Sequence, residues 1–492
     1  MMQSSALLLL AVLLPFAVLL LALNPRWQKI YRYCLPVLPL PALVLALLTD
    51  PGWWLEMPWL LNGGLWGLDE LRRSFLILTA LLWSVAGVFA AGYLSDRKLR
   101  GFCVFWTLTL AGNLGLCVAA DIASFYSFFA LMTFAGYGLV VHEGTEEANR
   151  AGRVYLAMAV VGEMAILTGL LMAAQLSGSA VLAHIPAALV DAEQRWLIML
   201  LLIAGFGVKA GLPLLHFWLP LAHPVAPTPA SAVLSGAMIK AGLLGWLVTL
   251  PFGEVSLPIW GNILVVLGAI GSLGAAALGV RQVRPKTVLA YSSISQMGLM
   301  VLMVGAALAH AEAAGAMFAV LALYALHHGL AKGSLFLSTA MAIPAGRVGR
   351  WGLWVLIALP GLSLAGLPFT SGAAAKLAMK EVLKPERFGF FMADYLPALM
   401  TAGAIATLLL IWRFLWAQGQ VARTGANPAC MWLGWGLATA ASLILFWWLP
   451  WHPSLPGITW AASMVESAWS LAWPMILGTV LAAMAWKSVK QG

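Results

Sequence analysis

Runs of about twenty apolar residues recur along the whole chain, and no other feature limits its fold so strongly. A stretch of this length crosses the hydrocarbon core of a bilayer as a helix. Only 9% of the 492 residues are charged and 62% are hydrophobic, whereas soluble domains carry roughly 25% charged residues. The sequence therefore predicts an all-α polytopic membrane protein. The alternation typical of a membrane β-barrel does not occur in it.

The apolar runs predict about 14–15 transmembrane helices. We expect them near residues 6–23, 31–49, 74–94, 101–119, 122–141, 154–175, 195–219, 228–250, 257–279, 288–308, 313–341, 351–382, 392–415, 430–449 and 467–486. Two of the long segments contain helix breakers, Pro213 in one and Gly366-Leu367-Pro368 in the other. Because proline lacks the backbone N–H that continues a helix, both segments are expected to be discontinuous.

The net charge of +9 does not indicate a nucleic-acid-binding protein, because the basic residues do not form one face. They fall mainly in alternate loops, with examples at Arg150, Arg153, Arg281 and Arg284, which is typical of cytoplasmic loops. This pattern predicts a multi-pass protein of the cell (inner) membrane with its N-terminus outside and its C-terminus in the cytoplasm. The first 23 residues lack a basic segment before the apolar run, so we expect a retained first helix.

No cofactor or metal site is expected in this chain. The four cysteines (Cys34, Cys103, Cys117 and Cys430) show neither a CxxC motif nor metal-ligand spacing, and are expected to pack as small apolar groups. No P-loop and no nucleotide-binding glycine motif follows a strand. No catalytic residue is predicted, so whether the chain belongs to an enzyme is left open.

The most unusual stretch is 205–247, where two lysines lie in apolar surroundings on either side of a proline-rich segment. Lys209 and Lys240 flank five prolines and two histidines, His216 and His223. Irregular backbone at membrane depth is tolerated only where it is buried in protein or lines a wet cavity. An ionisable residue inside a membrane is a functional-site hypothesis by default. The stretch therefore predicts part of an ion path.

Basic residues are frequent inside the predicted spans, and acids are scarce. The basic residues are Lys209, Lys240, Lys332, Lys376, Lys380 and Arg413. Each central lysine costs roughly 2.5–3.5 kcal/mol on the insertion scale, which argues for a function. Glu163 is the single acid well inside a span. Burial favours a neutral amine over an ammonium group, so proton exchange at such lysines is plausible.

Structural roles compete with these functional ones. Lys209 and Lys376 lie beside helix breaks, so their structural role would be to bind freed carbonyl groups. For Lys240 and Lys332 the structural alternative is a side chain that extends toward an interface. Lys380 and Arg413 are more typical of side chains that bind loops or carbonyls. Paired histidines such as His327 and His328, like His216 and His223, either relay protons or hold the backbone. Asp121, at the entrance of a span, is expected to cap a helix.

Four separated motifs together resemble a known family. They are KAGLPLLHFWLPLAHPVAPTPASAVLSGAMIKAG at 209–242, PKTVLAYSSISQMG at 285–298, HHGLAKGSLFL at 327–337 and LSLAGLPFTSGAAAKLAMK at 362–380. In this order they resemble the antiporter-like proton-translocating membrane subunits shared by complex I (NADH-quinone oxidoreductase), Mrp cation/proton antiporters and group 4 membrane hydrogenases. The resemblance covers about 65–415, and AHPVAPTPASAVLSG is most similar to Mrp D-type and hydrogenase-type subunits.

The resemblance implies two inverted five-helix repeats, each with a discontinuous helix. They would occupy 101–250, broken at Pro213, and 257–415, broken at Pro368, with further transmembrane helices at 1–100 and 416–492. It also implies a proton path through Lys209, Lys240, Lys332 and Lys376. His328, one turn before Lys332, would share its helix face.

One position departs from the family pattern. The motif that normally contains a glutamate reads FFALM here, with Ala130 at the place of the acid. The carboxylate that the family pairs with the lysine at Lys209 is therefore missing from that helix. Glu163, on the next helix, is the buried acid that remains to replace it. We expect Glu163 to lie close to Lys209.

The function implied is that of a proton-translocating subunit in a multi-subunit complex, coupled to an NADH-quinone oxidoreductase-like or hydrogenase-like redox module. Its partners would be other antiporter-like and small helical membrane subunits, with a soluble redox arm. One alternative is a subunit of an Mrp-type Na⁺/H⁺ antiporter. Another is a scaffold that has lost transport or takes part in inorganic-carbon uptake, which the alanine at position 130 keeps open.

Overall fold

The computed structural model describes residues 2–23, 26–61, 63–96, 98–384, 393–448 and 464–491. Within these ranges eleven helices are long and apolar enough to cross a membrane, and two shorter apolar helices follow at 429–445 and 468–484. The predicted all-α, multi-pass membrane architecture is confirmed. The predicted C-terminal segment includes residues 449–463, which lie outside the described residues.

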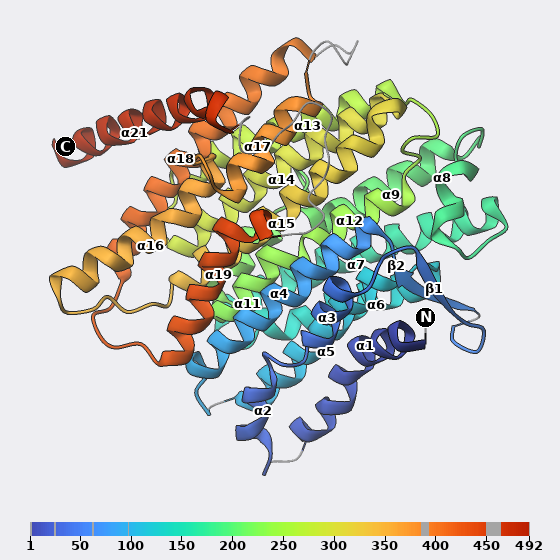
Figure 1. The fold of residues 1–492 in the computed structure, drawn as a ribbon, viewed down its shortest axis with the longest axis horizontal. Helices are drawn as coiled ribbons and strands as arrows, with labels where there is room; N and C mark the ends of the chain where they lie inside the picture. Colours follow the sequence, from blue (N-terminus) through green and yellow to red (C-terminus); the bar gives the residue numbers. More distant parts are fainter. Residues whose placement is uncertain are drawn as a thin grey trace. The chain divides into compact units, whose positions relative to one another are not determined.

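The chain divides into two compact units. Unit 1 contains 1–255, blue to green in Figure 1, and 428–435, which includes the start of α19. Its elements are α1 (Met2–Leu23), α2 (Gln28–Cys34), α3 (Leu40–Leu48), β1 (Trp53–Met57), β2 (Gly64–Leu68), α4 (Glu70–Tyr93), α5 (Leu99–Val118), α6 (Ile122–Val140), α7 (Glu146–Ser177), α8 (Ile185–Ala188), α9 (Arg195–Ala210), α10 (Trp218–Val225), α11 (Thr228–Val233), a π-helical turn (Leu234–Met238) and α12 (Lys240–Thr249).

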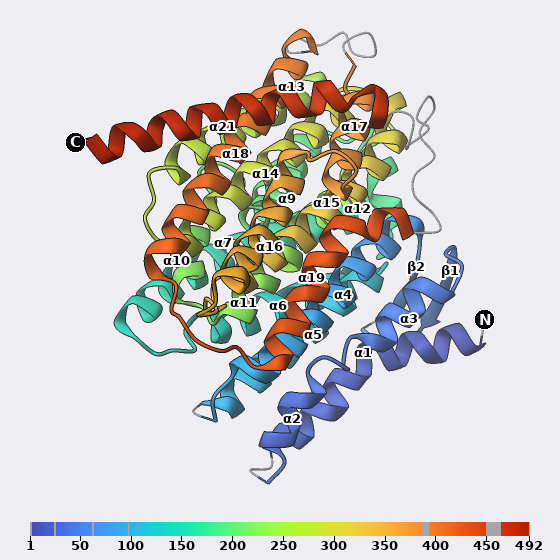
Figure 2. The ribbon, with the colours of Figure 1, turned by 60° about the vertical axis from the view of Figure 1, so that its left-hand side comes forward.

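Unit 2 contains 256–427 and 436–492, yellow to red in Figure 1. Its elements are α13 (Pro258–Gly279), α14 (Pro285–Ala309), α15 (Ala314–Ser338), α16 (Arg347–Ala365), α17 (Ser371–Val382), α18 (Leu396–Val421), most of α19 (Ala429–Trp448) and α21 (Ala468–Gln491), with short 3-10 turns at 311–313 and 393–395. Within this unit α18 and α21 pack side by side (Figure 2).

Both predicted helix breaks occur, and the same four residue types form them. In unit 1, Ala-Gly-Leu-Pro ends α9; in unit 2, the same tetrapeptide ends α16. Each glycine has a left-handed backbone, with φ of 77° at Gly211 and 105° at Gly366, which is a common way to end a helix. Leu214 and Phe369, three residues further on, also have positive φ. The two breaks therefore have matching backbone geometry.

Two features near the N-terminus were not predicted. The segment 31–49, expected as one span, forms α2 and α3 with a turn between them. After α3, strands β1 and β2 form an antiparallel hairpin in which Trp53 pairs with Leu68 and Met57 pairs with Gly64. The hydropathy of this region does not distinguish a short helix pair from a span, because both bury apolar residues.

Asp121 joins this hairpin to the helices that follow. Its carboxylate accepts a hydrogen bond from the backbone N–H of Leu65 at 2.8 Å and one from Ser124 at 2.7 Å, and the second bond caps α6. The side chain is 1% exposed. The structure therefore confirms the expected cap, and the same carboxylate also fixes β2 against α6.

Replacing Asp121 by alanine is expected to destabilise unit 1. Asp121→Ala would leave the buried N–H of Ser124 and the partly buried N–H of Leu65 without this acceptor, at a cost of about 2–3 kcal/mol. Thr145→Ala is the control, because Thr145 caps only the exposed start of α7 through Ala148, and its loss costs about 1 kcal/mol. Thermal unfolding in detergent would measure both. Equal shifts in Tm would contradict the double role of Asp121.

Candidate functional site

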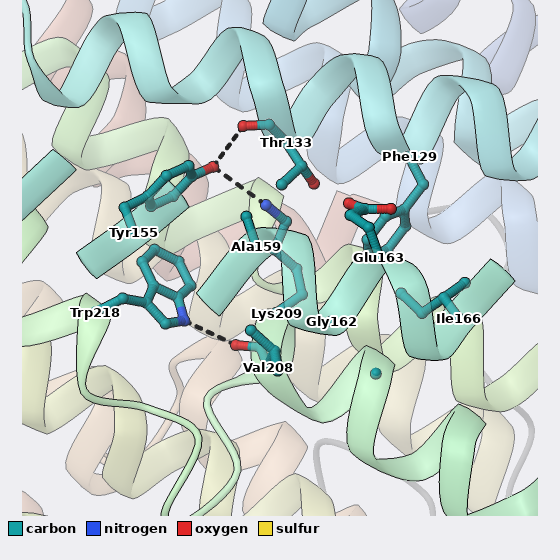
Figure 3. Close-up of a pocket in the computed structure, with 11 residues that line it drawn as sticks. Phe129, Thr133, Tyr155, Ala159, Gly162, Glu163, Ile166, Val208, Lys209 and Trp218 are labelled. Carbon is teal, nitrogen blue, oxygen red and sulfur yellow. Dashed lines mark hydrogen bonds between the residues drawn. The ribbon is translucent and has the colours of Figure 1, made fainter. Parts of the chain in front are cut away.

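Four helices of unit 1 surround a buried cavity (Figure 3). Its lining residues come from α6, α7, α9 and the start of α10: Phe129, Thr133, Tyr155, Ala159, Gly162, Glu163, Ile166, Gly205, Val208, Lys209 and Trp218. The cavity volume is about 20 Å³, counted as the room open to the centre of a water molecule. A cavity of this size holds about one water, provided that polar groups line it. Lys209 and Glu163 are the two charged side chains on its wall.

The helical period explains why these residues meet. Tyr155, Ala159, Glu163 and Ile166 follow one another at spacings of three or four residues, so they lie on one face of α7. Glycines allow α7 and α9 to approach closely. A Cβ at Gly205 would lie 2.9 Å from the backbone oxygen of Gly162. Small residues at a helix crossing let two backbones pack closely in a membrane, and here the crossing places Glu163 and Lys209 on the same cavity.

Lys209 is held by aromatic and hydroxyl groups rather than by an acid. It lies in the last turn of α9 and is 5% exposed. Its amino group lies 3.4 Å from the Tyr155 hydroxyl and 5.5–5.9 Å from the ring centroids of Phe129, Tyr155 and Trp218. In Figure 3 the amino group points toward the Tyr155 hydroxyl. The Tyr155 hydroxyl in turn donates to the backbone oxygen of Thr133 at 2.8 Å.

Glu163 faces the same cavity from α7. The side chain is 3% exposed, and neither oxygen has a hydrogen-bond partner among the described residues. No salt bridge joins it to Lys209 in the part of the chain that the structure describes. A buried charge without a partner is costly, and the cost falls when the group is protonated or a cation approaches. The arrangement can therefore exchange a proton or attract the lysine.

Lys240 donates to an irregular part of its own helix. The backbone between α11 and α12 is a π-helical turn, Leu234–Met238, and such turns are frequent at functional sites. The Lys240 amino group donates to the backbone oxygen of Ser235 at 2.8 Å. The side chain is 1% exposed, so it does not extend toward an interface.

In unit 2 the lysines also donate to backbone oxygens. Lys332, completely buried in α15, donates to Leu289 of α14 at 3.4 Å. Lys376 of α17 donates at 2.9 Å to Ala365, the last residue of α16 before the break. This tether to a freed carbonyl is the structural role considered for Lys376, and it coexists with burial of the amino group.

The histidines of α15 are buried beside these lysines. His328 is 0% exposed and lies one helical turn before Lys332, as expected. His327 is also buried and packs against α17. A Cβ at Gly372 would lie 2.9 Å from its Nε2 atom, and Gly372 lies one turn before Lys376. His327, which the family resemblance does not include in the path, therefore contacts the helix that carries Lys376.

The remaining candidates are dispersed. His223 is buried in α10, whereas His216 is partly exposed in the broken segment and stacks on Phe217 at 5.2 Å. Lys380 is partly exposed in the last turn of α17. Arg413 donates to the backbone oxygen of Gln282 at 2.6 Å and lies over the Trp416 ring. These contacts match the structural roles considered for Arg413.

Sequence reasoning missed the aromatic side chains around Lys209. Tyr155 is eight residues before Glu163, so its place on the same face of α7 follows from the helical period. The approach of Phe129 and Trp218 depends on how α6 and α10 pack. A buried chain of hydrogen bonds in unit 2 was also missed, in which Tyr324 donates to Gln296 and Gln296 donates to Thr407.

The fold and this cavity define a class of membrane protein: a bundle of membrane-spanning helices, two of them broken, with lysines buried in both units. Two solved structures share the fold. The Mrp complex from Dietzia sp. DQ12-45-1b aligns with a TM-score of 0.79 and 22% identity over 98% of this chain and 56% of that chain. The membrane-bound sulfane sulfur reductase, an archaeal respiratory membrane complex, aligns with a TM-score of 0.77 and 21% identity over 97% and 84%.

Residues 119–349 match the protein family described as NADH:quinone oxidoreductase/Mrp antiporter, TM. Hydrogenase-4 component B of Escherichia coli (strain K12) is 30% identical over 56% of this chain and 43% of that protein. NADH-quinone oxidoreductase subunit N of Desulforudis audaxviator (strain MP104C) is 30% identical over 67% and 66%. The D-type Na⁺/H⁺ antiporter subunit of Alkalihalophilus pseudofirmus is 26% identical over 64% and 66%. The chain belongs to this family of antiporter-like membrane subunits, although it spans less than two thirds of the length of these first relatives.

The crossing of α7 and α9 yields a testable prediction. Gly205→Ala would place a methyl group against the backbone of Gly162 and Ile166, separate the two helices and cost about 1–3 kcal/mol. Gly274→Ala in α13 is the control, because a Cβ there meets nothing within 4 Å. Thermal unfolding in detergent measures both, and a neutral Gly205→Ala would contradict the close crossing.

Proposed function

We propose that this chain is the proton-translocating membrane subunit of a multi-subunit complex, coupled to a redox module of the NADH-quinone oxidoreductase or hydrogenase type. The observation that carries the proposal is the cavity shared by Lys209 and Glu163. A buried amine and a buried carboxylate that face the same water-sized space can pass a proton between them, directly or through that water. The hydrogenase and NADH-quinone oxidoreductase relatives support the redox assignment.

Glu163 replaces the carboxylate that family resemblance implies at Ala130. When Glu163 is ionised, it stabilises the ammonium form of Lys209; when it is protonated, that stabilisation is lost and Lys209 releases its proton more readily. Proton transfer at this site would therefore respond to any charge that changes the state of Glu163. Lys240 in unit 1, and Lys332, Lys376 and His328 in unit 2, would continue the path, with the remaining histidines, Lys380 and Arg413 in supporting roles.

The partners proposed are other membrane subunits of the same complex, together with a soluble redox arm. Support comes from the solved relatives, which are described as an Mrp complex and a respiratory membrane complex. The proposed location is the cell inner membrane, with the N-terminus outside and the C-terminus in the cytoplasm, as the loop charges predict.

A second candidate is a subunit of an Mrp-type cation/proton antiporter. The similarity to the D-type antiporter protein and to the Mrp complex favours it. The cavity chemistry is the same for both candidates, because both need a buried amine that gains and loses a proton. Purification of the intact assembly from native membranes and identification of its subunits separates them: redox subunits support the first candidate, and small antiporter subunits without a redox module support the second.

Substitution of the two charged cavity residues tests the proton-transfer site. Lys209→Gln and Glu163→Gln are expected to reduce proton transport by at least about tenfold, because each removes a proton-binding group while keeping similar volume. Transport is measured as dye-reported pH change in proteoliposomes that contain the intact assembly.

The controls are the same Lys→Gln and Glu→Gln substitutions at residues outside the cavity. Lys98 also donates to backbone oxygens, but in a loop between α4 and α5, and Glu312 is exposed in the turn before α15. Lys98→Gln and Glu312→Gln should leave transport unchanged. Subunit composition of each variant is checked by gel filtration. Full transport by Lys209→Gln in an intact assembly would refute the proposed function.

A further inference from the structure

Three aromatic rings from three helices surround the amino group of Lys209. Its Nζ atom lies 5.9 Å from the ring centroid of Phe129 on α6, 5.5 Å from that of Tyr155 on α7 and 5.8 Å from that of Trp218 on α10. A cation over a ring and within about 6 Å of its centroid is attracted by the negative face of the ring. At Tyr155 the amino group, 3.4 Å from the hydroxyl oxygen, lies beside the hydroxyl end of the ring. In the buried interior of a helix bundle this attraction is larger than at an exposed site.

We propose that Phe129, Tyr155 and Trp218 form a cation-binding cage that holds the Lys209 ammonium group away from Glu163. Lys209 then has two alternative partners on one cavity, the cage and the carboxylate. The inference rests on the proposed function and adds to it the residues that position the lysine between proton transfers. Phe129, Tyr155 and Trp218 are positioning residues that act through Lys209.

The hydroxyl group of Tyr155 strengthens the cage. Its proton is directed to the backbone oxygen of Thr133 at 2.8 Å, so its oxygen is left to accept from Lys209 at 3.4 Å. A phenol fixed in this way accepts a hydrogen bond from the amine and does not protonate it. Gly136 on α6 leaves room for the group, since a Cβ there would lie 2.9 Å from the Tyr155 hydroxyl oxygen.

Trp218 is hydrogen-bonded to the backbone next to Lys209. Its indole N–H donates to the backbone oxygen of Val208 at 2.8 Å, and Val208 directly precedes Lys209. The indole ring also packs against Tyr155 edge to face, with centroids 5.1 Å apart. Because the break after α9 returns the chain to this point, the discontinuous helix supplies both the lysine and one wall of its cage.

Glu163 lies on the same cavity but makes no salt bridge with the lysine in this conformation. The flexible four-carbon side chain of lysine allows its amino group to move between two partners without a shift of the backbone. The titratable groups that line the cavity with Lys209 are Glu163 and Tyr155, both on α7; on α12, Lys240 donates to Ser235 instead. Movement toward Glu163 therefore exchanges an aromatic partner for an acidic one.

Stepwise fluorination of Phe129 tests the cage by its electrostatics alone. Mono-, di- and trifluorophenylalanine at position 129 weaken the negative ring face with little change in shape. The intact assembly in proteoliposomes is given an imposed pH difference, and the rate of its dissipation is measured. The rate is expected to fall by about two- to fivefold over the series, and its logarithm is expected to fall by a similar step with each fluorine.

Phe206 provides a matched control. It is completely buried on α9 and packs edge to face on Phe129 at 5.5 Å, but it is not among the rings around Lys209. The same fluorination series at position 206 should leave the rate unchanged. Equal slopes at positions 129 and 206, or a flat series at 129, would overturn the cage.

Conservative variants give an independent reading. Trp218→Tyr and Trp218→Phe should retain most of the transport rate, whereas Trp218→Leu should lower it, because only the first two keep a ring. Tyr155→Phe should lower the rate less than Tyr155→Leu. If Lys209→Gln abolishes transport while these variants and the fluorination series have no effect, the cage is wrong and the proposed function stands. If Lys209→Gln transports normally, the proposed function itself fails.

Discussion

An amino group buried at membrane depth must find a polar partner or give up its charge, and this constraint governs the positions of the lysines in both units. A central lysine costs roughly 2.5–3.5 kcal/mol to insert. Lys240, Lys332 and Lys376 meet the constraint by donating to backbone oxygens. Lys209 meets it with a hydroxyl group and aromatic rings instead. The first three lysines therefore have a fixed backbone acceptor, whereas the partners of Lys209 can change.

The backbone irregularities and the lysines stabilise one another. A broken or π-helical segment leaves carbonyl groups without their helical partners, and such groups must be satisfied inside the bilayer. Ala365 ends α16 at the break and accepts from Lys376; Ser235 lies in the π-helical turn and accepts from Lys240. At the other break, the backbone oxygen of Val208 accepts from Trp218. The lysine beside that break is thereby left to interact with the cavity.

The features that could be predicted from the sequence are those that depend on residues close together in the chain. Hydropathy indicated the helices, proline and glycine indicated both breaks, and the scarcity of buried acids led to Glu163 as the acid near Lys209. Contacts between helices distant in the sequence could not be predicted. The cage joins Phe129 to Trp218 across three elements, and the hairpin of β1 and β2 depends on pairing and on a distant carboxylate, Asp121. The hydropathy pattern of a single segment does not predict these contacts.

The geometry of the cavity supports the proposal that Glu163 takes the place of the acid missing at Ala130. Family resemblance implies a carboxylate at Ala130 on α6, whereas in this chain the carboxylate that lines the cavity is Glu163 on α7. A lysine responds to the charge that faces it, whichever wall provides the charge. Gly162 packs α7 directly against α9, so a carboxylate beside this glycine is held by a rigid helix contact. With the acid on α7, α6 contributes the ring of Phe129 to the same cavity. In the proposed exchange, Glu163 keeps a carboxylate on the cavity with Lys209, and the proposed cage gives the lysine an aromatic alternative.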